Sequence, residues 1–396
     1  MDYNSITEID ANYYMRTFNR MPAAFERGEG CLLYDVNGKE YLDFFAGIAV
    51  NALGYNDKEF VAAVADQVGK LIHTSNIFYS PVQARFIKTL LAGSDFNRVF
   101  LSNSGAEANE CAIKIVRKAA NAEQNGKTTV ITALKSFHGR TVTTATATGQ
   151  PKYAQPFAPL TPGFKYVPYN DCAALKEAVT DDVGAIMLEN ILGESGIFPA
   201  DYEFINTAYV LAKSKGLFLI FDEIQTGVGR TGKFFGYEHY DIVPDIVTLA
   251  KGIAGGIPMG ATLARGIAAD TLKPGEHGST FGGNALACRA ADVVVARIKT
   301  PAFLADVARK GTYLIHELTE LKSLPCVKDV RGRGLMAGLE LAEPVKNSDI
   351  ATKMLEKGFV INAAGSNTLR FCPPLVITEG QINQMITALK DILDNH

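Results

Sequence analysis

Apolar and polar positions alternate on a large scale through the middle of the chain. Between about residues 98 and 265, short apolar runs are separated by longer stretches with helical periodicity. The apolar runs read RVFLS, TTVITA, GAIMLEN, LFLIF, DIVTLA and GATLA. Continuous apolar runs of this length are typical of strands that are buried on both faces, in a mostly parallel sheet covered by helices. The pattern therefore predicts an α/β fold.

The two ends of the chain have a different pattern. Near the N-terminus, LLYDVNGKEYLDF contains two short runs around Asn37-Gly38, which is a strong signal for a two-residue hairpin. After about residue 290, a long helical stretch leads to the strand-like runs DVRGRGLMAGLEL and LRFCPPLVI. We therefore predict a large central domain over residues 56–290 and a smaller domain assembled from residues 1–55 and 291–396.

Composition excludes several classes of protein. The chain has 396 residues, of which 47% are hydrophobic and 20% charged, so it can bury a large core. A net charge of -3 without runs of Lys and Arg gives no electrostatic footprint for nucleic acid. The six cysteines form no CxxC pair, so neither a metal site nor a disulfide framework is indicated. Because the N-terminus lacks a signal-peptide pattern and the apolar runs are too short to span a membrane, we expect a cytoplasmic protein with a small-molecule partner.

Two glycine-rich stretches point to other ligands. Residues 227–232, GVGRTG, match the dinucleotide fingerprint of nicotinamide-dependent oxidoreductases. That fingerprint needs a strand directly before it and a helix directly after it, whereas five residues separate LFLIF from Gly227 and the sequence KFFGYEHYDIVPD follows. Gly126-Lys127-Thr128 resembles the end of a P-loop, but Asn121 stands where a P-loop requires glycine. We therefore discount the first stretch as a dinucleotide site and interpret the second as a turn.

The segment SNSGAE, residues 102–107, follows the predicted strand RVFLS and opens a helix that continues to about residue 123. Ser104 and Glu107 have the spacing of a capping box, which stabilises a helix start. The first N–H groups of a helix are unpaired and carry partial positive charge, and Gly105 lets a ligand approach the backbone. The segment can therefore be a helix cap, a phosphate-binding site, or both.

Charged residues follow two of the predicted strands. Asp222 and Glu223 end LFLIF, and ligands bind at the carboxyl ends of the strands in a parallel sheet. An acidic pair in this place can also simply face solvent. Lys251 lies between DIVTLA and the glycine-rich GIAGGIPMGA. Burial there would lower the pKa of Lys251 and favour a neutral, nucleophilic amine, the type that forms Schiff bases with carbonyl cofactors. The alternative for Lys251 is a solvated surface lysine.

Taken in order, the motifs SNSGAEANE, FHGR, DEIQTGVGRTG, TLAKG and GSTFGGN resemble those of the class III, fold type I aminotransferases, which use pyridoxal phosphate. The resemblance extends from LLYDVNGKEYLDFFAGIAVNALGY to LRFCPPLVI, nearly the whole chain. It implies a mostly parallel central sheet that binds the cofactor, a smaller α+β domain from both chain ends, and a homodimer.

The resemblance also implies how the cofactor ring is bound. Lys251 would form the Schiff base with pyridoxal phosphate and afterwards move the proton of the substrate. Asp222 would pair with the pyridine nitrogen and keep it protonated, so that the ring can accept electrons. Gln225 would contact the side of the ring that carries the phenolic oxygen. Lys251 and Asp222 are thus the expected catalytic residues.

Phosphate and ring-face contacts follow from the same resemblance. Gly105 and Ala106 would bind the phosphate through backbone N–H groups, and Thr280 would reach it from the other subunit. Phe137 would stack on the ring face. The complete expected set of cofactor-binding residues is Gly105, Ala106, Phe137, Asp222, Glu223, Ile224, Gln225, Lys251 and Thr280.

The resemblance further implies four substrate-binding residues. Arg140 would clamp one substrate carboxylate, and Ser279 would also touch the substrate. Arg370 would bind the other carboxylate of 2-oxoglutarate, and Glu194 would pair with an arginine while the amine donor is bound. Glu189 is the weaker candidate for that acidic role. Together, Arg370 and Glu194 would let one pocket accept first a donor without the second carboxylate and then an acceptor that has it.

Within the class, DFFAGIAVNALGY and HTSNIFY are most similar to acetylornithine aminotransferases. Ile48 stands where ornithine enzymes carry a Tyr, and an apolar residue suits an acylated nitrogen. ENILGE in place of EPxxGE, and Tyr55 in place of His, depart from the family pattern. The implied reaction is N-acetyl-L-ornithine with 2-oxoglutarate, in arginine biosynthesis. Rival donors are succinylornithine, succinyl-diaminopimelate, ornithine and 4-aminobutyrate.

Three other classes of function are also considered. A decarboxylase, racemase or aminomutase of the same fold would not need two carboxylate clamps. A non-catalytic ligand sensor would not need Lys251 and Asp222. An oxidoreductase would not bind pyridoxal phosphate and would therefore lack its yellow colour.

Overall fold

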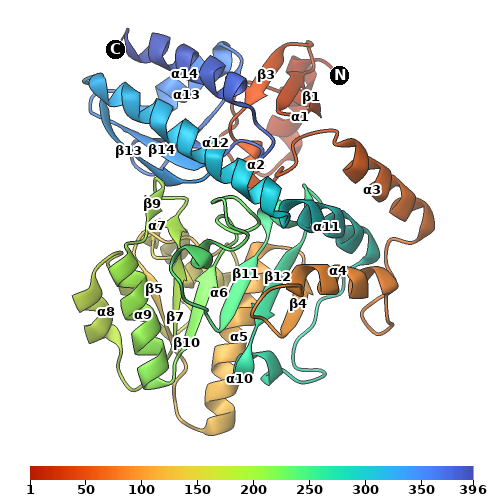
Figure 1. The fold of residues 1–396 in the computed structure, drawn as a ribbon, viewed down its shortest axis with the longest axis vertical. Helices are drawn as coiled ribbons and strands as arrows, with labels where there is room; N and C mark the ends of the chain where they lie inside the picture. The colour runs from red at the N-terminus through yellow and green to blue at the C-terminus, as the bar shows by residue number, and fades with distance from the viewer. Residues whose placement is uncertain (396) are drawn as a thin grey trace.

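The computed structural model describes residues 1–395 (Figure 1). Its largest sheet has the strand order β4-β12-β11-β10-β7-β5-β6. The strands of this sheet are β4 (Arg98–Ser102), β12 (Gly260–Ala264), β11 (Ile246–Leu249), β10 (Phe218–Asp222), β7 (Val183–Glu189), β5 (Thr129–Ala133) and β6 (Phe164–Val167). β12 runs antiparallel to both of its neighbours, and the other neighbouring pairs are parallel. The structure confirms the predicted α/β fold with a mostly parallel sheet.

Each of the six apolar runs forms a strand of this sheet, and the burial of those strands explains their composition. Every residue of β5, β7, β11 and β12 is buried. Alternate residues of β7 join different apolar clusters: Ala185 and Met187 pack with α5 (Gly105–Glu123), whereas Ile186 and Leu188 pack into the larger core on the other face. Because both faces are covered, the strands cannot alternate apolar with polar residues.

Helices cover the two faces of the large sheet. α5 contacts β4, β11 and β12, while α9 (Tyr202–Lys215) contacts β7 and β10. α8 (Cys172–Ala178) packs on β6 and α9. α11 (Ala285–Ile298) packs against α3 (Lys58–Lys70) and α4 (Pro81–Leu91). These helices leave the carboxyl ends of the parallel strands facing the rest of the chain.

The N-terminal and C-terminal segments meet in two further sheets. β15 (Phe359–Val360) pairs in parallel with β3 (Glu40–Asp43), which joins β1 (Phe25–Glu29) and β2 (Leu32–Asp35). The β2–β3 connection is the predicted hairpin, with Gly38 at a φ of 82°. The other sheet has the order β13-β14-β17-β16, with bounds β13 (Val327–Arg333), β14 (Met336–Leu341), β17 (Thr368–Phe371) and β16 (Asn362–Ala364). Domain limits at residues 55 and 290 stay a prediction, and residue 290 lies within α11.

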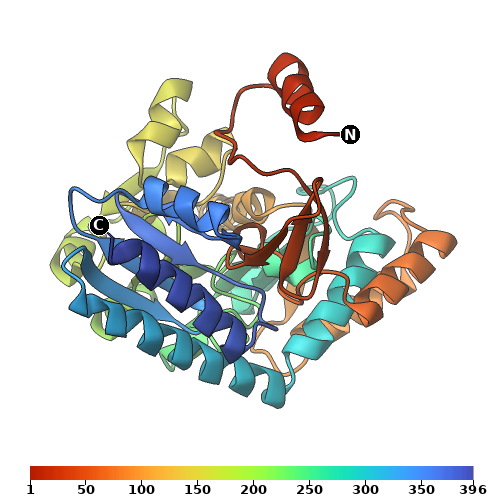
Figure 2. The ribbon, with the colours of Figure 1, turned by 90° about the horizontal axis from the view of Figure 1, so that it is seen from above.

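Other elements complete the described chain. The helices α12 (Pro301–Glu320), α13 (Asn347–Glu356) and α14 (Glu379–Leu393) pack beside the sheets formed by the chain ends. The short elements are α2 (Ala46–Ala49), α6 (Val142–Ala147), α7 (Pro151–Ala154), α10 (Gly266–Asp270), β8 (Ile191–Leu192) and β9 (Phe198–Pro199). α1 (Tyr3–Tyr13) stands away from the body of the molecule, and its residues are exposed or half-buried (Figure 2). Within residues 1–395, no helix is both long and apolar enough to cross a membrane.

Candidate functional site

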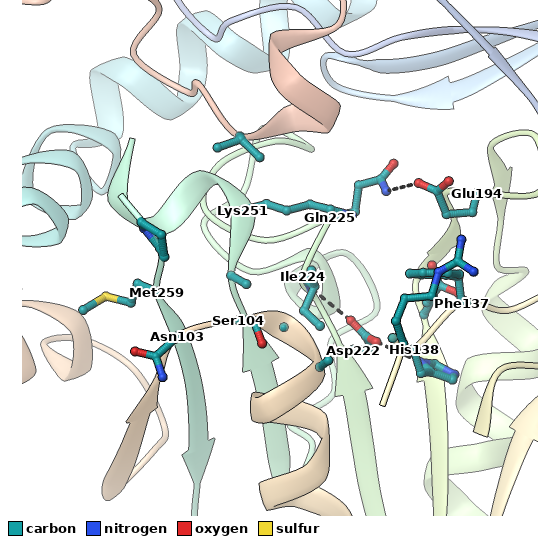
Figure 3. A pocket seen from close by; sticks show the side chains of 18 of the residues that line it. Asn103, Ser104, Phe137, His138, Glu194, Asp222, Ile224, Gln225, Lys251 and Met259 are labelled. Atoms are coloured by element: carbon teal, nitrogen blue, oxygen red, sulfur yellow. Dashed lines mark hydrogen bonds and ion pairs between the residues drawn. The ribbon is translucent and has the colours of Figure 1, made fainter. Parts of the chain in front are cut away.

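A cavity of about 420 Å³ opens at the carboxyl ends of β4, β7, β10 and β11 (Figure 3). This volume is within the range of pockets that hold small ligands, and the place is where open α/β sheets bind them. The cavity brings together most of the residues predicted from the sequence. These are Gly105, Ala106, Phe137, Arg140, Glu194, Asp222, Ile224, Gln225 and Lys251.

Lys251 begins the 3-10 turn η3 (Lys251–Ala254), directly after β11. Its φ is 43°, a left-handed conformation that is unfavourable for a side chain with a Cβ and typical of functional positions. The side chain lies in the cavity, beside Gln225 (Figure 3). Burial lowers the pKa of the Lys251 amine, and the nearby carboxylate of Glu194 opposes that shift. A lowered pKa increases the fraction of neutral amine, which is the form that acts as nucleophile or base.

Asp222, at the end of β10, is held by three hydrogen bonds. Its Oδ2 accepts from Asn109 Nδ2 and from His138 Nδ1, each at 2.8 Å, and its Oδ1 accepts from the Ile224 N–H at 3.1 Å. Burial disfavours the charged form of His138, but the hydrogen bond to Asp222 and the carboxylate charge outweigh it and raise the pKa of the imidazole. Asp222 is therefore a fixed carboxylate at the cavity wall.

The sequence interpretation missed Asn109 and His138 as members of this group. Both belong to motifs that were identified, since Asn109 lies in SNSGAEANE and His138 in FHGR. Asn109 is itself fixed, because Thr248 donates to its Oδ1 at 2.7 Å. Both side chains are buried, and a buried polar side chain needs a partner, but this burial is visible only in the structure.

The start of α5 lies at the cavity, where the sequence predicts a phosphate site. Ser104 caps the helix by accepting from the Glu107 N–H at 3.2 Å, whereas the Glu107 carboxylate accepts from the N–H of Asn103 rather than from that of Ser104. A Cβ on Gly105 would lie 2.6 Å from Ile224 Cδ1, so a larger residue would require the Ile224 side chain to shift. The N–H groups of Gly105 and Ala106 have no partner within the helix and carry partial positive charge. The geometry supports anion binding at this point.

Arg370, Glu194 and Gln225 form a closed hydrogen-bonded group above the cavity. Arg370 Nη1 lies 2.6 Å from Glu194 Oε1 and 3.2 Å from Gln225 Oε1. Gln225 Nε2 donates to the same Glu194 oxygen at 3.2 Å (Figure 3). Burial would raise the pKa of Glu194, but Arg370 and Lys251 outweigh it and lower that pKa to about 2. Glu194 is therefore a carboxylate at any physiological pH, paired with Arg370 as expected.

Glu189, the weaker candidate for the acidic role, binds backbone instead of arginine. Its carboxylate accepts from the N–H of Phe137 at 2.8 Å and from the N–H of Gly193 at 3.3 Å. Burial raises the pKa of Glu189 to about 7. Glu189 therefore fixes the backbone on either side of the cavity, and Glu194 is the acid that contacts Arg370.

Arg140 and Phe137 form the exposed side of the cavity. The Arg140 guanidinium lies 4.2 Å from the ring centre of Tyr153 and 5.4 Å from that of Phe137. These cation–π contacts hold an exposed guanidinium in place without neutralising its charge. Arg140 is thus available to bind an anion, and Tyr153 is a supporting residue that the sequence did not reveal.

Four of the predicted residues lie outside the described cavity lining: Glu223, Ser279, Thr280 and Arg370. Ser279 is close by, because its Oγ accepts from Asn103 Nδ2 at 3.1 Å. Arg370 is connected to the lining through Glu194 and Gln225. Thr280 is exposed, and its contact with the phosphate of another subunit stays a prediction.

Glu223 lies outside the cavity lining, with its carboxylate bound elsewhere, and its expected contact with the cofactor stays a prediction. Its carboxylate accepts from the N–H groups of Gly236 and Tyr237, at 2.6 and 2.7 Å. Burial raises its pKa to about 8. These contacts direct the Glu223 carboxylate toward η2, whereas Asp222, the last residue of β10, lines the cavity.

The glycine-rich residues 227–232 form successive turns, and a 3-10 turn, η2 (Gly236–His239), follows them. Within this stretch, Arg230 is buried and donates from Nη1 to the carbonyl of Leu335 at 3.0 Å. The stretch therefore connects the large sheet with the C-terminal sheet, and it lacks the strand and helix that a dinucleotide fingerprint needs.

Comparison with known proteins gives a consistent result. The model of the family "Aminotransferase class-III" matches residues 13–393. Acetylornithine aminotransferase from Caldanaerobacter subterraneus is 48% identical over 97% of this chain and 98% of the relative. N-acetylornithine aminotransferase from Stenotrophomonas maltophilia has 37% identity and a TM-score of 0.84 over 98% of both chains. A structure of ornithine aminotransferase from Toxoplasma gondii, with partial occupancy of PLP at its active site, has 32% identity and a TM-score of 0.95 over 100% of this chain and 94% of that chain.

Proposed function

The chain belongs to the class III aminotransferases, and we propose that it transfers the amino group of N-acetyl-L-ornithine to 2-oxoglutarate. The products are N-acetyl-L-glutamate 5-semialdehyde and L-glutamate, in a step of arginine biosynthesis. The observation that carries the proposal is the pairing of Arg370 with Glu194 at 2.6 Å beside Lys251. The Glu194 carboxylate can neutralise Arg370 and can also move away from it. This suits a pocket that must accept in turn a donor without a second carboxylate and an acceptor that has one. The 48% identity to an acetylornithine aminotransferase supports this donor.

The cavity residues fit pyridoxal phosphate. When bound, this cofactor supplies an aldehyde that exchanges with amines and a ring that takes up electrons released at the substrate carbon. Lys251 provides the amine for covalent attachment, and the unpaired N–H groups at the start of α5 suit the phosphate. Asp222, fixed by Asn109 and His138, provides a carboxylate that holds a proton on the ring nitrogen.

Lys251 is also the base of the reaction. With the cofactor bound to a substrate amine, the Lys251 Nζ would be free to take the proton from the substrate carbon that bears the nitrogen. The lowered pKa of Lys251 favours the neutral amine that this step requires. Arg140 aligns the substrate through one carboxylate, in bidentate contact. Arg370 binds the other carboxylate of 2-oxoglutarate after Glu194 has moved away.

The donor is tested with purified holoenzyme and a panel of amines, each with 2-oxoglutarate. We expect N-acetylornithine to give the highest kcat/KM, above succinylornithine, succinyl-diaminopimelate, ornithine and 4-aminobutyrate. Without 2-oxoglutarate, N-acetylornithine should abolish the visible absorbance band of the bound cofactor. A band that persists would contradict transamination of this donor, and a higher kcat/KM with another amine would reassign the substrate.

Glu194→Gln should affect the two substrates differently. The substitution leaves the guanidinium of Arg370 without its carboxylate, so a donor that lacks a second carboxylate binds beside an uncompensated buried charge. We expect KM for N-acetylornithine to rise about tenfold, which corresponds to about 1.4 kcal/mol, and KM for the acceptor 2-oxoglutarate to stay constant or fall. Steady-state kinetics of both substrates measures the split.

Glu340→Gln is the matched control, because Glu340 pairs with Arg331 at 2.6 Å, in the C-terminal sheet. It should leave both KM values within about twofold of wild type. An equal change of both KM values in Glu194→Gln would contradict the role of Glu194 in discriminating the substrates.

We also infer that the enzyme is a homodimer and cytoplasmic. Ile77 and Phe78 are 86% and 67% exposed, and Phe281, next to Thr280, is 63% exposed. The two segments are joined, since Asn76 Nδ2 donates to the carbonyl oxygens of Ser279 and Gly282. Exposed apolar side chains grouped in this way mark a protein interface, and a second copy there would bring Thr280 toward the partner's phosphate.

The cytoplasmic location is supported by the cysteines. All six are free thiols in the structure, which suits a reducing compartment.

A further inference from the structure

Asn362 lies opposite Arg370 in the C-terminal sheet. The two residues are direct partners in the antiparallel pairing of β16 with β17. The side-chain oxygen of Asn362 accepts two hydrogen bonds from the guanidinium, from Nε at 3.1 Å and from Nη2 at 2.7 Å. Neighbouring strands thus hold one edge of the guanidinium at a fixed place, and Asn362 is not itself one of the residues that line the cavity.

The two edges of the Arg370 guanidinium have different partners. The Nε and Nη2 edge contacts the neutral amide of Asn362. Nη1 contacts the Glu194 carboxylate, the carbonyl oxygen of Gly193 at 3.0 Å and the amide oxygen of Gln225 at 3.2 Å. Among the described residues, Glu194 is therefore the one carboxylate that neutralises Arg370.

The different partners of the two guanidinium edges become important when Glu194 moves away from Arg370. Arg370 is only 2% exposed in the paired state, and a buried charge that loses its partner is costly. A flexible arginine side chain loses up to about 2 kcal/mol of conformational entropy when it is fixed, so a guanidinium without a permanent partner would have to be ordered by each incoming substrate. Asn362 holds the Nε and Nη2 edge independently of Glu194, whereas the other neutral acceptors, Gly193 and Gln225, contact Nη1. As a neutral acceptor, Asn362 leaves the positive charge available to a substrate carboxylate.

We propose that Asn362 is a positioning residue that sets the specificity for a dicarboxylate acceptor: it holds Arg370 in place without neutralising it while Glu194 is displaced. The inference rests on the proposed function, in which Arg370 binds the second carboxylate of 2-oxoglutarate. Asn362→Asp is the decisive change, since it has nearly the same shape and keeps both hydrogen bonds but gives Arg370 a permanent carboxylate. Asn362→Ala removes both hydrogen bonds to Arg370 and leaves the positive charge of Arg370 unchanged.

The test measures binding as well as activity of the holoenzyme. Glutarate has the two carboxylates of 2-oxoglutarate but lacks the reactive carbonyl, so its Kd can be determined by calorimetry, with butyrate as the monocarboxylate comparison. For Asn362→Asp we expect both the Kd for glutarate and the KM for the acceptor 2-oxoglutarate to rise at least tenfold. The Kd for butyrate and the KM for N-acetylornithine should stay within about twofold. For Asn362→Ala we expect a smaller rise of the glutarate Kd, of about threefold.

Asn383→Asp is the charge control, because Asn383 is exposed on α14 and its side-chain oxygen accepts from Tyr313. It adds the same negative charge far from Arg370 and should leave all four constants unchanged. Unchanged glutarate binding in Asn362→Asp, or an equal rise of both KM values, would overturn the role of Asn362. If wild-type holoenzyme bound glutarate no better than butyrate, the role of Arg370 in the proposed function would fail as well, so the two failures are distinguishable.

Discussion

Lys251→Ala is expected to lower kcat by about 10⁴-fold. In the proposed mechanism Lys251, the one lysine of the described cavity lining, has two functions: covalent attachment of the cofactor and proton transfer at the substrate carbon. General acid–base catalysis alone contributes about 10² to 10⁴ in rate. The lysine lines the cavity, and its lowered pKa makes it the available neutral amine there. Since burial already disfavours the charged amine, removing it should leave the fold intact.

Pre-steady-state kinetics and circular dichroism measure the two parts of this expectation. Borohydride reduction of the wild-type holoenzyme followed by peptide mapping should place the cofactor on Lys251. Lys58→Ala is the control, because Lys58 is exposed at the start of α3, and it should keep wild-type kcat. Labelling of another lysine, or a Lys251→Ala enzyme within tenfold of wild-type kcat, would remove Lys251 from the proposed mechanism.

The fold could be predicted where burial on both faces imposed a simple pattern. β5, β7 and β11 are buried throughout and therefore read as continuous apolar runs. β6, with the sequence FKYV, was not predicted, and only one of its four residues is buried. A strand that is not buried on both faces need not form a continuous apolar run, so its sequence carries a weaker signal.

The site could be predicted where a residue lies at the end of a strand or the start of a helix. Asp222 and Lys251 follow apolar strands, and Gly105 opens a helix, so their places are visible along the chain. Asn109 and His138 act on Asp222 from positions 113 and 84 residues away in sequence, and no local pattern indicates such a contact.

Asp222→Asn is expected to lower kcat by about 10³-fold with the shape of the residue retained. The carboxylate, fixed by His138 and Asn109, stabilises the proton on the ring nitrogen, and a neutral amide cannot do so. Removing one preorganised electrostatic group from an active site costs about 10² to 10³ in rate, and the amide also places a donor against two existing donors.

Glu223→Gln is the comparison, because it changes the adjacent carboxylate, which faces away from the cavity. It should lower the free energy of unfolding by about 1 kcal/mol and keep kcat within about threefold of wild type. Single-turnover kinetics and thermal unfolding of the two variants separate these effects. A similar loss of kcat in both would show that the strand end acts as a unit, against the assignment of the catalytic charge to Asp222 alone.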